Sequence, residues 1–461
     1  MLPIGIQQFW EKLLEELLES RQFNRVRDML AEMNAVDIAA LLEDRSDEQT
    51  LLLFRLLPKT PAAEVFAYME HDTQERLIGV LTDRELASVM DELNMDDAAD
   101  LVEEMPANVV KRVLRMTDPA DRRIINQLLL YPEDSAGSVL TTEFVDLKAT
   151  MTVDEALDYI RRFGPDKETI YTCYVTDADR HLEGVLTVKE LLLSSGDCRV
   201  GDLMETNVIS VTTTEDQEQV AALFAKYDLI ALPVVDSEGR LVGIITVDDV
   251  VDIMRKETTE DIEKMAAILP TDRPYLKTGV FETYRKRIPW LLLLMVSATF
   301  TGMIITRFET ALSSVVALAA FMPMLMDTGG NSGSQASVSI IRSLALGEVE
   351  FRDVLRVIWK ELRVSIVCGT TLAAANFAKI MLFDNLVLKS GISMTVALVV
   401  CLTILITVII AKLVGCTLPL FAKKCGFDPA VMASPFITTI VDAVSLVVYF
   451  QMATLLLHLS L

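Results

Sequence analysis

The chain has 461 residues, of which 42 are Lys or Arg and 66 are Asp or Glu, so its formal net charge is −24. From Thr278 onward there are 14 basic and 10 acidic residues, so the first 277 residues carry the whole acidic excess, a net −28. Such an acidic surface repels phosphates, which argues against nucleic acid as a partner and favours cations. The six cysteines form no CxxC pair, so neither a zinc motif nor a disulfide framework is indicated.

Residues 1–135 are predicted to be helical throughout, because apolar residues recur at three- and four-residue spacing. The phrases NAVDIAALLE (34–43) and NMDDAADLVE (94–103) resemble each other and indicate a helical repeat. We therefore expect an all-α superhelical N-terminal domain. The first residues are charged and amphipathic and lack the apolar core of a signal peptide, so this half of the chain is expected in the cytosol.

A second repeat follows in residues 136–254. The segments TCYVTDADRHLEGVLTVKELL and LPVVDSEGRLVGIITVDDVV align without gaps, and Asp177, Gly184 and Thr187 each have the same residue type 59 positions later. Each copy predicts a strand, a polar turn, a second strand and a helix, with another helix upstream. This α/β unit, occurring twice, resembles a pair of CBS domains, which sense nucleotides or ions.

A charged connecting helix, residues 255–280, leads into a transmembrane domain of five helices, residues 281–461. A bilayer requires about 20 apolar residues for each helix. The five predicted spans are about 288–306, 312–341, 358–383, 392–421 and 430–459. Basic residues cluster before the first span, around the second-to-third connection and after the fourth span. They predict a multi-pass protein of the cell membrane with a cytosolic N-terminus and an outside C-terminus.

The second span carries polar residues that are costly in lipid, within the segment PMLMDTGGNSGSQASVSIIRS. Pro323 and the three glycines are expected to weaken its helix, which is tolerated only in protein or beside a water-filled cavity. The alternative is close helix packing through Gly329 and Gly333, which have GxxxG spacing. Packing does not require the polar side chains, so a pore or site is favoured, formed by Asp327, Gly330, Asn331 and Ser334.

Asp442 is the only acid of the fifth span. On a helix, the backbone carbonyl of Thr438 lies on the same face. A carboxylate with carbonyl and hydroxyl oxygens suits a hard cation such as Mg²⁺ or Ca²⁺. The alternative is an ion pair between Asp442 and Lys412 of the fourth span.

The motifs PMLMDTGGNSGSQ and DPAVMASPFITTIVDAVSLVVYF closely resemble the MgtE family of magnesium channels. The resemblance covers nearly the whole chain. It implies a homodimer with one pore at the two-fold axis, lined by spans two and five. It also implies Mg²⁺ uptake, with Asp442 as the pore carboxylate, and with the carbonyl of Thr438 and the side chain of Ser434 beside it. Because Mg²⁺ sheds water reluctantly, such a pore is expected to hold the hydrated ion. No catalytic constellation is present, so an enzyme is not expected.

The acidic half is then interpreted as a Mg²⁺ sensor that closes the pore when divalent ions bridge acidic surfaces. The alternative for any single acid is simple solvation. The candidate regulatory residues are Asp96, Asp97, Asp100, Asp248, Asp249, Asp252, Glu257, Glu260, Asp261 and Asp428.

Thr246 and Asp249 also have the Thr-x-x-Asp spacing with which CBS pairs hold a nucleotide ribose, whereas Thr187 is followed by Glu190 at that spacing. ATP is therefore a candidate modulator. Three other functions stay open: a broader transporter of divalent cations such as Mn²⁺ or Co²⁺, an ion-coupled carrier using Lys412 and Asp327, and a membrane-anchored CBS sensor without transport. Asp442 and the polar second span argue against the sensor, because an anchor needs neither.

Overall fold

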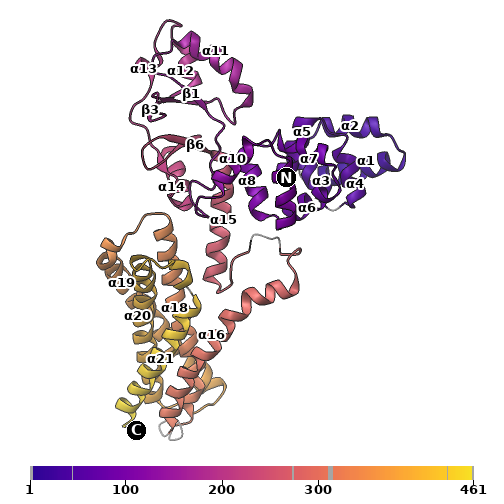
Figure 1. The fold of residues 1–461 in the computed structure, drawn as a ribbon. Coiled ribbons are helices and arrows are strands. Elements are labelled where there is room, and N and C mark those ends of the chain that lie inside the picture. Colours follow the sequence, from indigo (N-terminus) through magenta and orange to yellow (C-terminus); the bar gives the residue numbers. More distant parts are fainter. Residues whose placement is uncertain (1–3, 44, 272–274, 310–314, 433, 459–461) are drawn as a thin grey trace. The chain divides into compact units, whose positions relative to one another are not determined.

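The computed structural model describes residues 4–43, 45–271, 275–309, 315–432 and 434–458, with the backbone alone described for 4–8, 104 and 434. The chain divides into two compact units, Met1–Met254 and Arg255–Leu461 (Figure 1). The first unit contains short helices and two small sheets, and the second is a bundle of long helices.

The first unit begins with short helices, as the amphipathic pattern predicts. Local caps set several of their starts: the Ser46 side chain accepts from the backbone of Gln49, and Thr82 forms a capping box with Glu85. Helices two apart in sequence pack together, α3 on α5, α5 on α7 and α7 on α9, which agrees with the predicted superhelical repeat. The helices are α1 (Ile4–Glu19), α2 (Phe23–Ala31), α3 (Ala35–Glu43), α4 (Asp47–Phe54), α5 (Lys59–Ala67), α6 (His71–Val80), α7 (Asp83–Met90), α8 (Met95–Glu104), α9 (Ala107–Met116) and α10 (Asp121–Leu128).

Two sheets of three strands follow, in the orders β1-β2-β3 and β4-β5-β6. In each, the first strand is parallel and the third antiparallel to the central strand. Thr172 pairs with Thr187, and Ala231 pairs with Thr246, so the 59-residue repeat has the same register in both copies. The elements are β1 (Val145–Leu147), α11 (Val153–Phe163), η1 (Gly164–Asp166), β2 (Thr172–Thr176), β3 (Leu182–Thr187), α12 (Val188–Leu193), α13 (Val200–Leu203), β4 (Val211–Thr212), α14 (Gln217–Tyr227), β5 (Ala231–Val235), β6 (Leu241–Thr246) and α15 (Val247–Met265).

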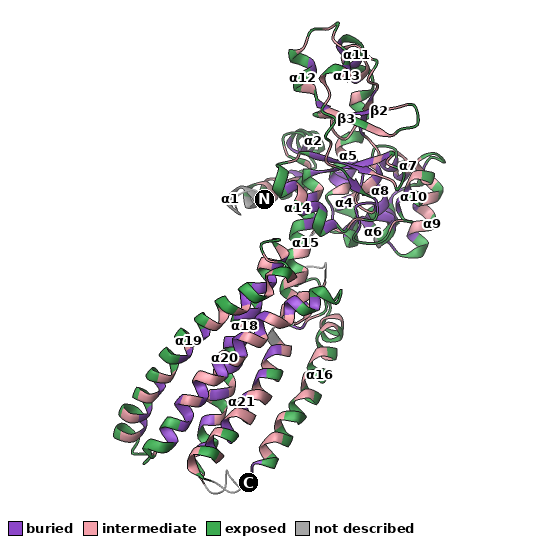
Figure 2. Cartoon of the chain, turned by 90° about the vertical axis from the view of Figure 1, so that its left-hand side faces the viewer, coloured by how far each residue is buried: buried purple, intermediate pink, exposed green. Residues whose placement is uncertain are grey.

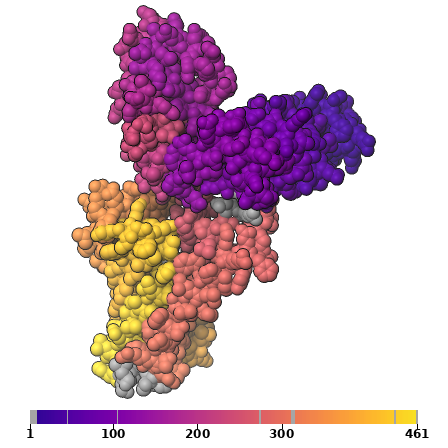
Figure 3. All heavy atoms as spheres, in the orientation of Figure 1, coloured from indigo at the N-terminus to yellow at the C-terminus, as the bar shows by residue number. Residues whose placement is uncertain are grey.

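The second unit is a helical bundle in which α20 packs against α18, α19 and α21 and contributes many buried residues (Figure 2). The helix α16 packs along α21, and none of its residues is buried in the single chain (Figures 2 and 3). The elements are α16 (Val280–Arg307), α18 (Ala317–Ala345), η2 (Phe351–Asp353), α19 (Val354–Lys379), η3 (Ile380–Val387, a π-helix), α20 (Met394–Lys424), η4 (Pro429–Met432) and α21 (Ser434–Leu457).

Four helical stretches of the described residues are long and apolar enough to cross a membrane: Val280–Arg307, Phe351–Val387, Met394–Lys424 and Pro429–Leu457. The remaining predicted span, the second, corresponds to α18, which has 29 residues and packs against α20 and α21. Its length suffices for a bilayer, but its polar residues make it less apolar than the four helices named above. The described residues thus contain four apolar candidate spans, and a fifth span formed by α18 stays a prediction.

The expected weakening of the second span is wrong, because α18 runs unbroken from Ala317 to Ala345. Its glycines instead allow neighbouring helices to approach closely. A Cβ on Gly333 would lie 2.7 Å from Cγ2 of Ile437 in α21, and a Cβ on Gly329 would lie 2.8 Å from Oγ of Ser445. Close packing offsets the low helix propensity of glycine. The packing role that the sequence left as an alternative is thus present at Gly329 and Gly333.

Candidate functional site

Gly330 of α18 lies against the polar face of α21. A Cβ at this position would lie 3.1 Å from Cγ2 of Thr438 and 3.7 Å from Oδ1 of Asp442. Both side chains are half-buried. The Thr438 hydroxyl donates to the carbonyl of Pro435 (3.0 Å), which leaves its oxygen able to accept from a water molecule. The structure therefore brings together three of the predicted pore residues, Gly330, Thr438 and Asp442.

A polar stripe runs along α18 beside this contact. Asp327, Asn331 and Gln335 are spaced by four residues, so they share one helix face, and all three are exposed in the single chain. The Asn331 amide donates to Oδ1 of Asp327 (3.0 Å). Asp327 lies one turn before Gly330, the residue that contacts Thr438 and Asp442. The stripe and Asp442 therefore belong to one polar surface rich in oxygen, the kind of surface that hydrated hard cations bind.

Two other predicted pore residues are less fully described. Ser334 is half-buried on α18, close to the stripe in sequence, and the side chain of Ser434 lies outside the described residues. The alternative partner for Asp442 is not realised: Lys412 is only 6% exposed, but among the described side chains it forms no ion pair with a carboxylate.

Acidic residues from both halves of the first unit meet at the start of two helices. Asp96 and Asp97 lie in the first turn of α8, and Asp248 and Asp249 lie in the first turn of α15. Burial, with repulsion from neighbouring acids, raises the pKa of Asp96 to about 7, of Asp97 to about 6 and of Asp249 to about 7. Oδ1 of Asp96 is buried without a hydrogen-bond partner in the described part of the chain. These neighbouring carboxylates can accept a cation.

Two further acids, Glu143 and Glu168, complete the group and were missed in the sequence. They lie on neighbouring segments, because the backbone N–H of Glu168 donates to the carbonyl of Glu143 (2.9 Å). Burial and repulsion from Asp96 raise the pKa of Glu143 to about 7 and of Glu168 to about 8. Asn94, which precedes α8, donates to Oε2 of Glu168. No motif signals them, since both stand in loops outside the aligned repeat. We call these six residues the acidic cluster: Asp96, Asp97, Glu143, Glu168, Asp248 and Asp249.

Asp100 and Asp252 lie one turn farther along the same helices, and both are exposed. Their position agrees better with a solvated face than with a ligand role.

The connecting helix carries a second charged group, within the second unit. Lys264 forms ion pairs with Glu260 and with Asp428, which precedes η4, the latter at 2.7 Å. Burial lowers the pKa of Lys264, but the hydrogen bonds to Asp428 and Glu260 outweigh burial, so the pKa is raised. Burial and the nearby Asp428 raise the pKa of Asp261. Met265 packs against Ile341 and Ala430 at this contact. Asp428, Glu260 and Asp261 thus lie together, with an ammonium group among them, and Glu257 lies one turn before Asp261 on the same helix.

The two CBS repeats differ at the candidate ribose site. Thr246 donates to Oδ2 of Asp249 (2.6 Å), so the carboxylate that would hold a ribose also belongs to the acidic cluster. At the equivalent position, Thr187 and Glu190 form a capping box at the start of α12. That motif is satisfied by its own helix and needs no ligand.

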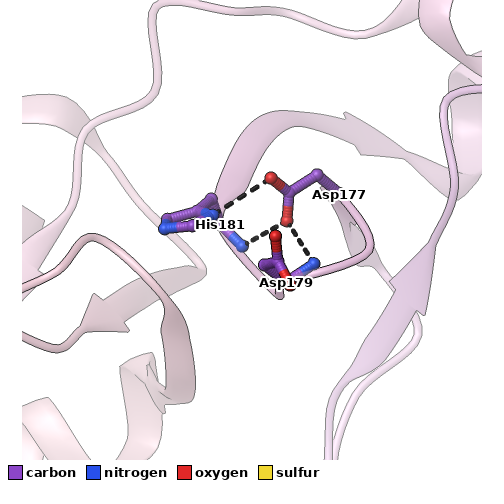
Figure 4. A group of neighbouring side chains, drawn as sticks. All are labelled: Asp177, Asp179 and His181. Atoms are coloured by element: carbon purple, nitrogen blue, oxygen red, sulfur yellow. Dashed lines mark hydrogen bonds and ion pairs between the residues drawn. The ribbon is translucent and has the colours of Figure 1, made fainter.

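Asp177, Asp179 and His181 form a surface group in the β2–β3 turn, close enough together to consider a metal (Figure 4). Oδ1 of Asp177 accepts from the backbone N–H groups of Asp179 and His181, both at 2.8 Å. In the second repeat, Asp236 accepts from the backbone of Glu238 and Arg240 in the same way, without a histidine. Asp177 therefore has a structural role, because its side chain closes the turn between the two strands.

Comparisons with known proteins agree with this architecture. The family described as divalent cation transporter (MgtE) matches residues 322–452, the MgtE intracellular N domain matches 33–134, and the CBS domain matches 136–196 and 200–256. The magnesium transporter MgtE of Thermus thermophilus is 37% identical over 449 residues, 96% of this chain and 98% of that protein. That of Bacillus subtilis is 32% identical over 442 residues, 96% of each chain.

A solved structure, the cytosolic domain of the Mg²⁺ channel MgtE in complex with ATP, is 40% identical, with a TM-score of 0.50; the match covers 52% of this chain and 98% of that one. A helical N-terminal domain, a CBS pair and a membrane bundle define a membrane transport protein with an intracellular N-terminal part. The chain belongs to the MgtE family.

Proposed function

We propose that this protein carries Mg²⁺ into the cell through a pore lined by α18 and α21, and that it is not an enzyme. The observation that carries the proposal is the contact of Gly330 with Thr438 and Asp442, which puts an intramembrane carboxylate on the polar face of α18. A carboxylate in a membrane helix is costly unless it serves an ion path. The relatives named magnesium transporters support Mg²⁺ as the ion.

The pore is completed by a second copy of the chain. In one chain, Asp327, Asn331 and Gln335 are exposed although their helix lies in the bundle, and a polar face exposed to lipid would be unfavourable. In a homodimer, the two polar faces form one path, with two Asp442 carboxylates facing each other. Mg²⁺ keeps several waters, so the carboxylates attract the charge while hydroxyl and carbonyl oxygens bind the hydration shell.

The domains are proposed to be residues 1–135, 136–254, 255–280 for the connecting segment and 281–461 for the membrane bundle. The predicted connecting helix is shorter than this segment, because α15 ends at Met265. Five spans put the N-terminus in the cytosol and the C-terminus outside. Basic residues support this orientation, because they gather at the ends of spans on the cytosolic side.

Cytosolic Mg²⁺ closes the pore by binding to the acidic cluster. Six carboxylates with little compensating charge repel each other until a divalent ion bridges them. The ion therefore favours the compact arrangement of helices α8 and α15, and the connecting helix transmits the change to Asp428 at the start of the last span. Asp100, Asp252 and Glu257 supply further negative charge at the edges of these sites.

ATP is proposed as a modulator through Thr246 and Asp249, as suggested by the ATP complex of the related cytosolic domain. Because Asp249 also belongs to the acidic cluster, nucleotide and Mg²⁺ would act on the same carboxylate.

Uptake into proteoliposomes containing a Mg²⁺-sensitive dye tests the transport proposal. Asp442→Asn should reduce Mg²⁺ flux at least about tenfold, since it removes the charge that attracts the ion, whereas Glu348→Gln, at an exposed acid of the same unit, should leave it unchanged. Parallel runs with Mn²⁺ and Co²⁺ separate a Mg²⁺ pathway from a broader one. Wild-type flux from a folded Asp442→Asn protein would rule out this pore.

A further inference from the structure

A cavity of about 870 Å³ lies between the ends of α16 and α21, away from the polar contact at Gly330. Its lining includes apolar residues set back from the helix ends: Ile304 lies one turn before the end of α16, and Val447 lies more than two turns before the end of α21. Phe308 also lines the cavity, and its ring stacks on Phe450 with ring centroids 4.8 Å apart. The volume falls in the range of cavities that bind ligands of moderate size.

Two basic residues line the cavity at the helix ends, near the apolar Leu455. Arg307 is the last residue of α16, and His458 directly follows the last residue of α21. Arg307 forms no ion pair with any described residue, and the nearest acid in sequence, Glu309, is exposed. A guanidinium group at the edge of an apolar region is stabilised by an anion that it can bind through two hydrogen bonds.

The same cavity is therefore lined by aliphatic side chains set back along the two helices and by a cation at the helix ends. We propose that the cavity binds one anionic phospholipid, with its phosphate at Arg307 and His458 and an acyl chain along Ile304 and Val447. A free phosphate would not use the apolar part. In the topology proposed above, the headgroup lies at the outer boundary of the bilayer, where lipid phosphates lie.

The surroundings of α16 favour lipid as the occupant. None of its residues is buried, and apolar side chains such as Phe300 and Met303 are 63% and 64% exposed. Of the long helices, α16 has its main contact with α21. A lipid in this cavity would contact both helices and stabilise their pairing, and α21 carries Asp442.

The test uses the full chain in an uncharged detergent. Thermal unfolding and native mass spectrometry are measured during titration with phosphatidylglycerol or phosphatidylcholine, with inorganic phosphate as a third arm. Wild type should bind phosphatidylglycerol more tightly and gain more thermal stability from it. Arg307→Gln should weaken that binding about tenfold, the effect of one charge-assisted hydrogen bond. Lys389→Gln, which removes another exposed basic residue of the second unit, should have no effect.

Val447→Trp provides a second variant, because it fills the apolar part and leaves Arg307 unchanged; it should also lose phosphatidylglycerol binding. Unchanged binding by Arg307→Gln would overturn the proposal, and so would equal stabilisation by inorganic phosphate. Loss of the dimer in Val447→Trp, without any lipid preference in wild type, would assign the cavity to contact with a second copy and would also overturn it. None of these readouts depends on transport, so they are independent of the proposed pore.

Discussion

Gly330 shows how one residue without a side chain sets the geometry of a candidate ion path. Its Cα hydrogens face Thr438 and Asp442, so any Cβ would enter the space beside the carboxylate. The adjacent glycines, Gly329 and Gly333, contact buried residues of α20 and α21 and serve packing. Neighbouring glycines of one motif therefore have different roles, which depend on the face of the helix.

We predict that Gly330→Ala reduces Mg²⁺ flux severalfold, because its methyl group displaces Thr438 and narrows the site. Overpacking of this kind costs about 1–3 kcal/mol. Gly302→Ala is the matched control, since a Cβ there meets nothing within 4 Å; it should keep full flux. Flux in proteoliposomes and the thermal unfolding midpoint are measured together. Equal flux in both variants would show that Gly330 is not beside the ion path.

The acidic cluster predicts a dependence of Mg²⁺ binding on pH. Burial and mutual repulsion raise the carboxyl pKa values of five of its members to between about 6 and 8: Asp96, Asp97, Glu143, Glu168 and Asp249. Raised acid pKa values mean that the compact state gains stability as pH falls through this range and loses it as pH rises. Mg²⁺ must displace those protons, so its apparent affinity should increase about tenfold or more from pH 6 to pH 8. Isothermal titration at fixed ionic strength measures this, and a flat profile would contradict it.

Glu168 tests the same cluster by substitution. Glu168→Gln keeps the shape and removes one charge, so the cluster should be more compact without Mg²⁺ at pH 8 and should bind Mg²⁺ more weakly. Asp166→Asn, two residues away and exposed, is the control and should behave as wild type. Identical titrations for the two variants would exclude Glu168 from the site.

At the scale of elements, Lys264 of the connecting helix binds Asp428, in the segment that leads into η4 and α21. Lys264 lies between Glu260 and Asp428, where the sequence suggested that Mg²⁺ joins these acids. The Mg²⁺ ligand role of Asp428 stays a prediction. The structure adds that an ammonium group already compensates part of the charge, so a divalent ion has to compete with Lys264 or bind beside it.

Removing this ammonium should loosen the contact when Mg²⁺ is absent. In a Cys425→Ser background, the pair Met265→Cys and Ala430→Cys reports the contact, because Met265 packs against Ala430. Adding Lys264→Met should lower the cross-link yield without Mg²⁺ and restore it with Mg²⁺, since the freed acids then bind the ion. Arg255→Gln, exposed on the same helix, should change neither yield. An equal cross-link yield with and without Lys264→Met would show that the ammonium group does not hold this contact together.

At the scale of the whole molecule, the sequence predicted those features that come from a repeat or from a charged residue in an apolar span. The 59-residue repeat predicted the sheets with their shared register, and Asp442 stood out as the only acid of its span. Glu143 and Glu168 were missed because loops have no periodicity, and only the fold brings them to Asp96. The continuity of α18 was missed because glycine lowers helix propensity locally, whereas contacts with α20 and α21 decide the helix. The sequence did not predict a role for Lys264, because only the fold brings Asp428 beside it.

The central claim is that Mg²⁺ passes through this protein and closes it from the cytosolic side. The most direct measurement is single-channel or macroscopic current from the reconstituted full chain while Mg²⁺ on the cytosolic side is raised at constant ionic strength and pH 7.5. Wild type should conduct at low cytosolic Mg²⁺ and close as Mg²⁺ increases. A double variant, Glu168→Gln with Asp96→Asn, should need several times more Mg²⁺ to close. Current that is independent of cytosolic Mg²⁺ in wild type, or closure unchanged in the double variant, would contradict the account.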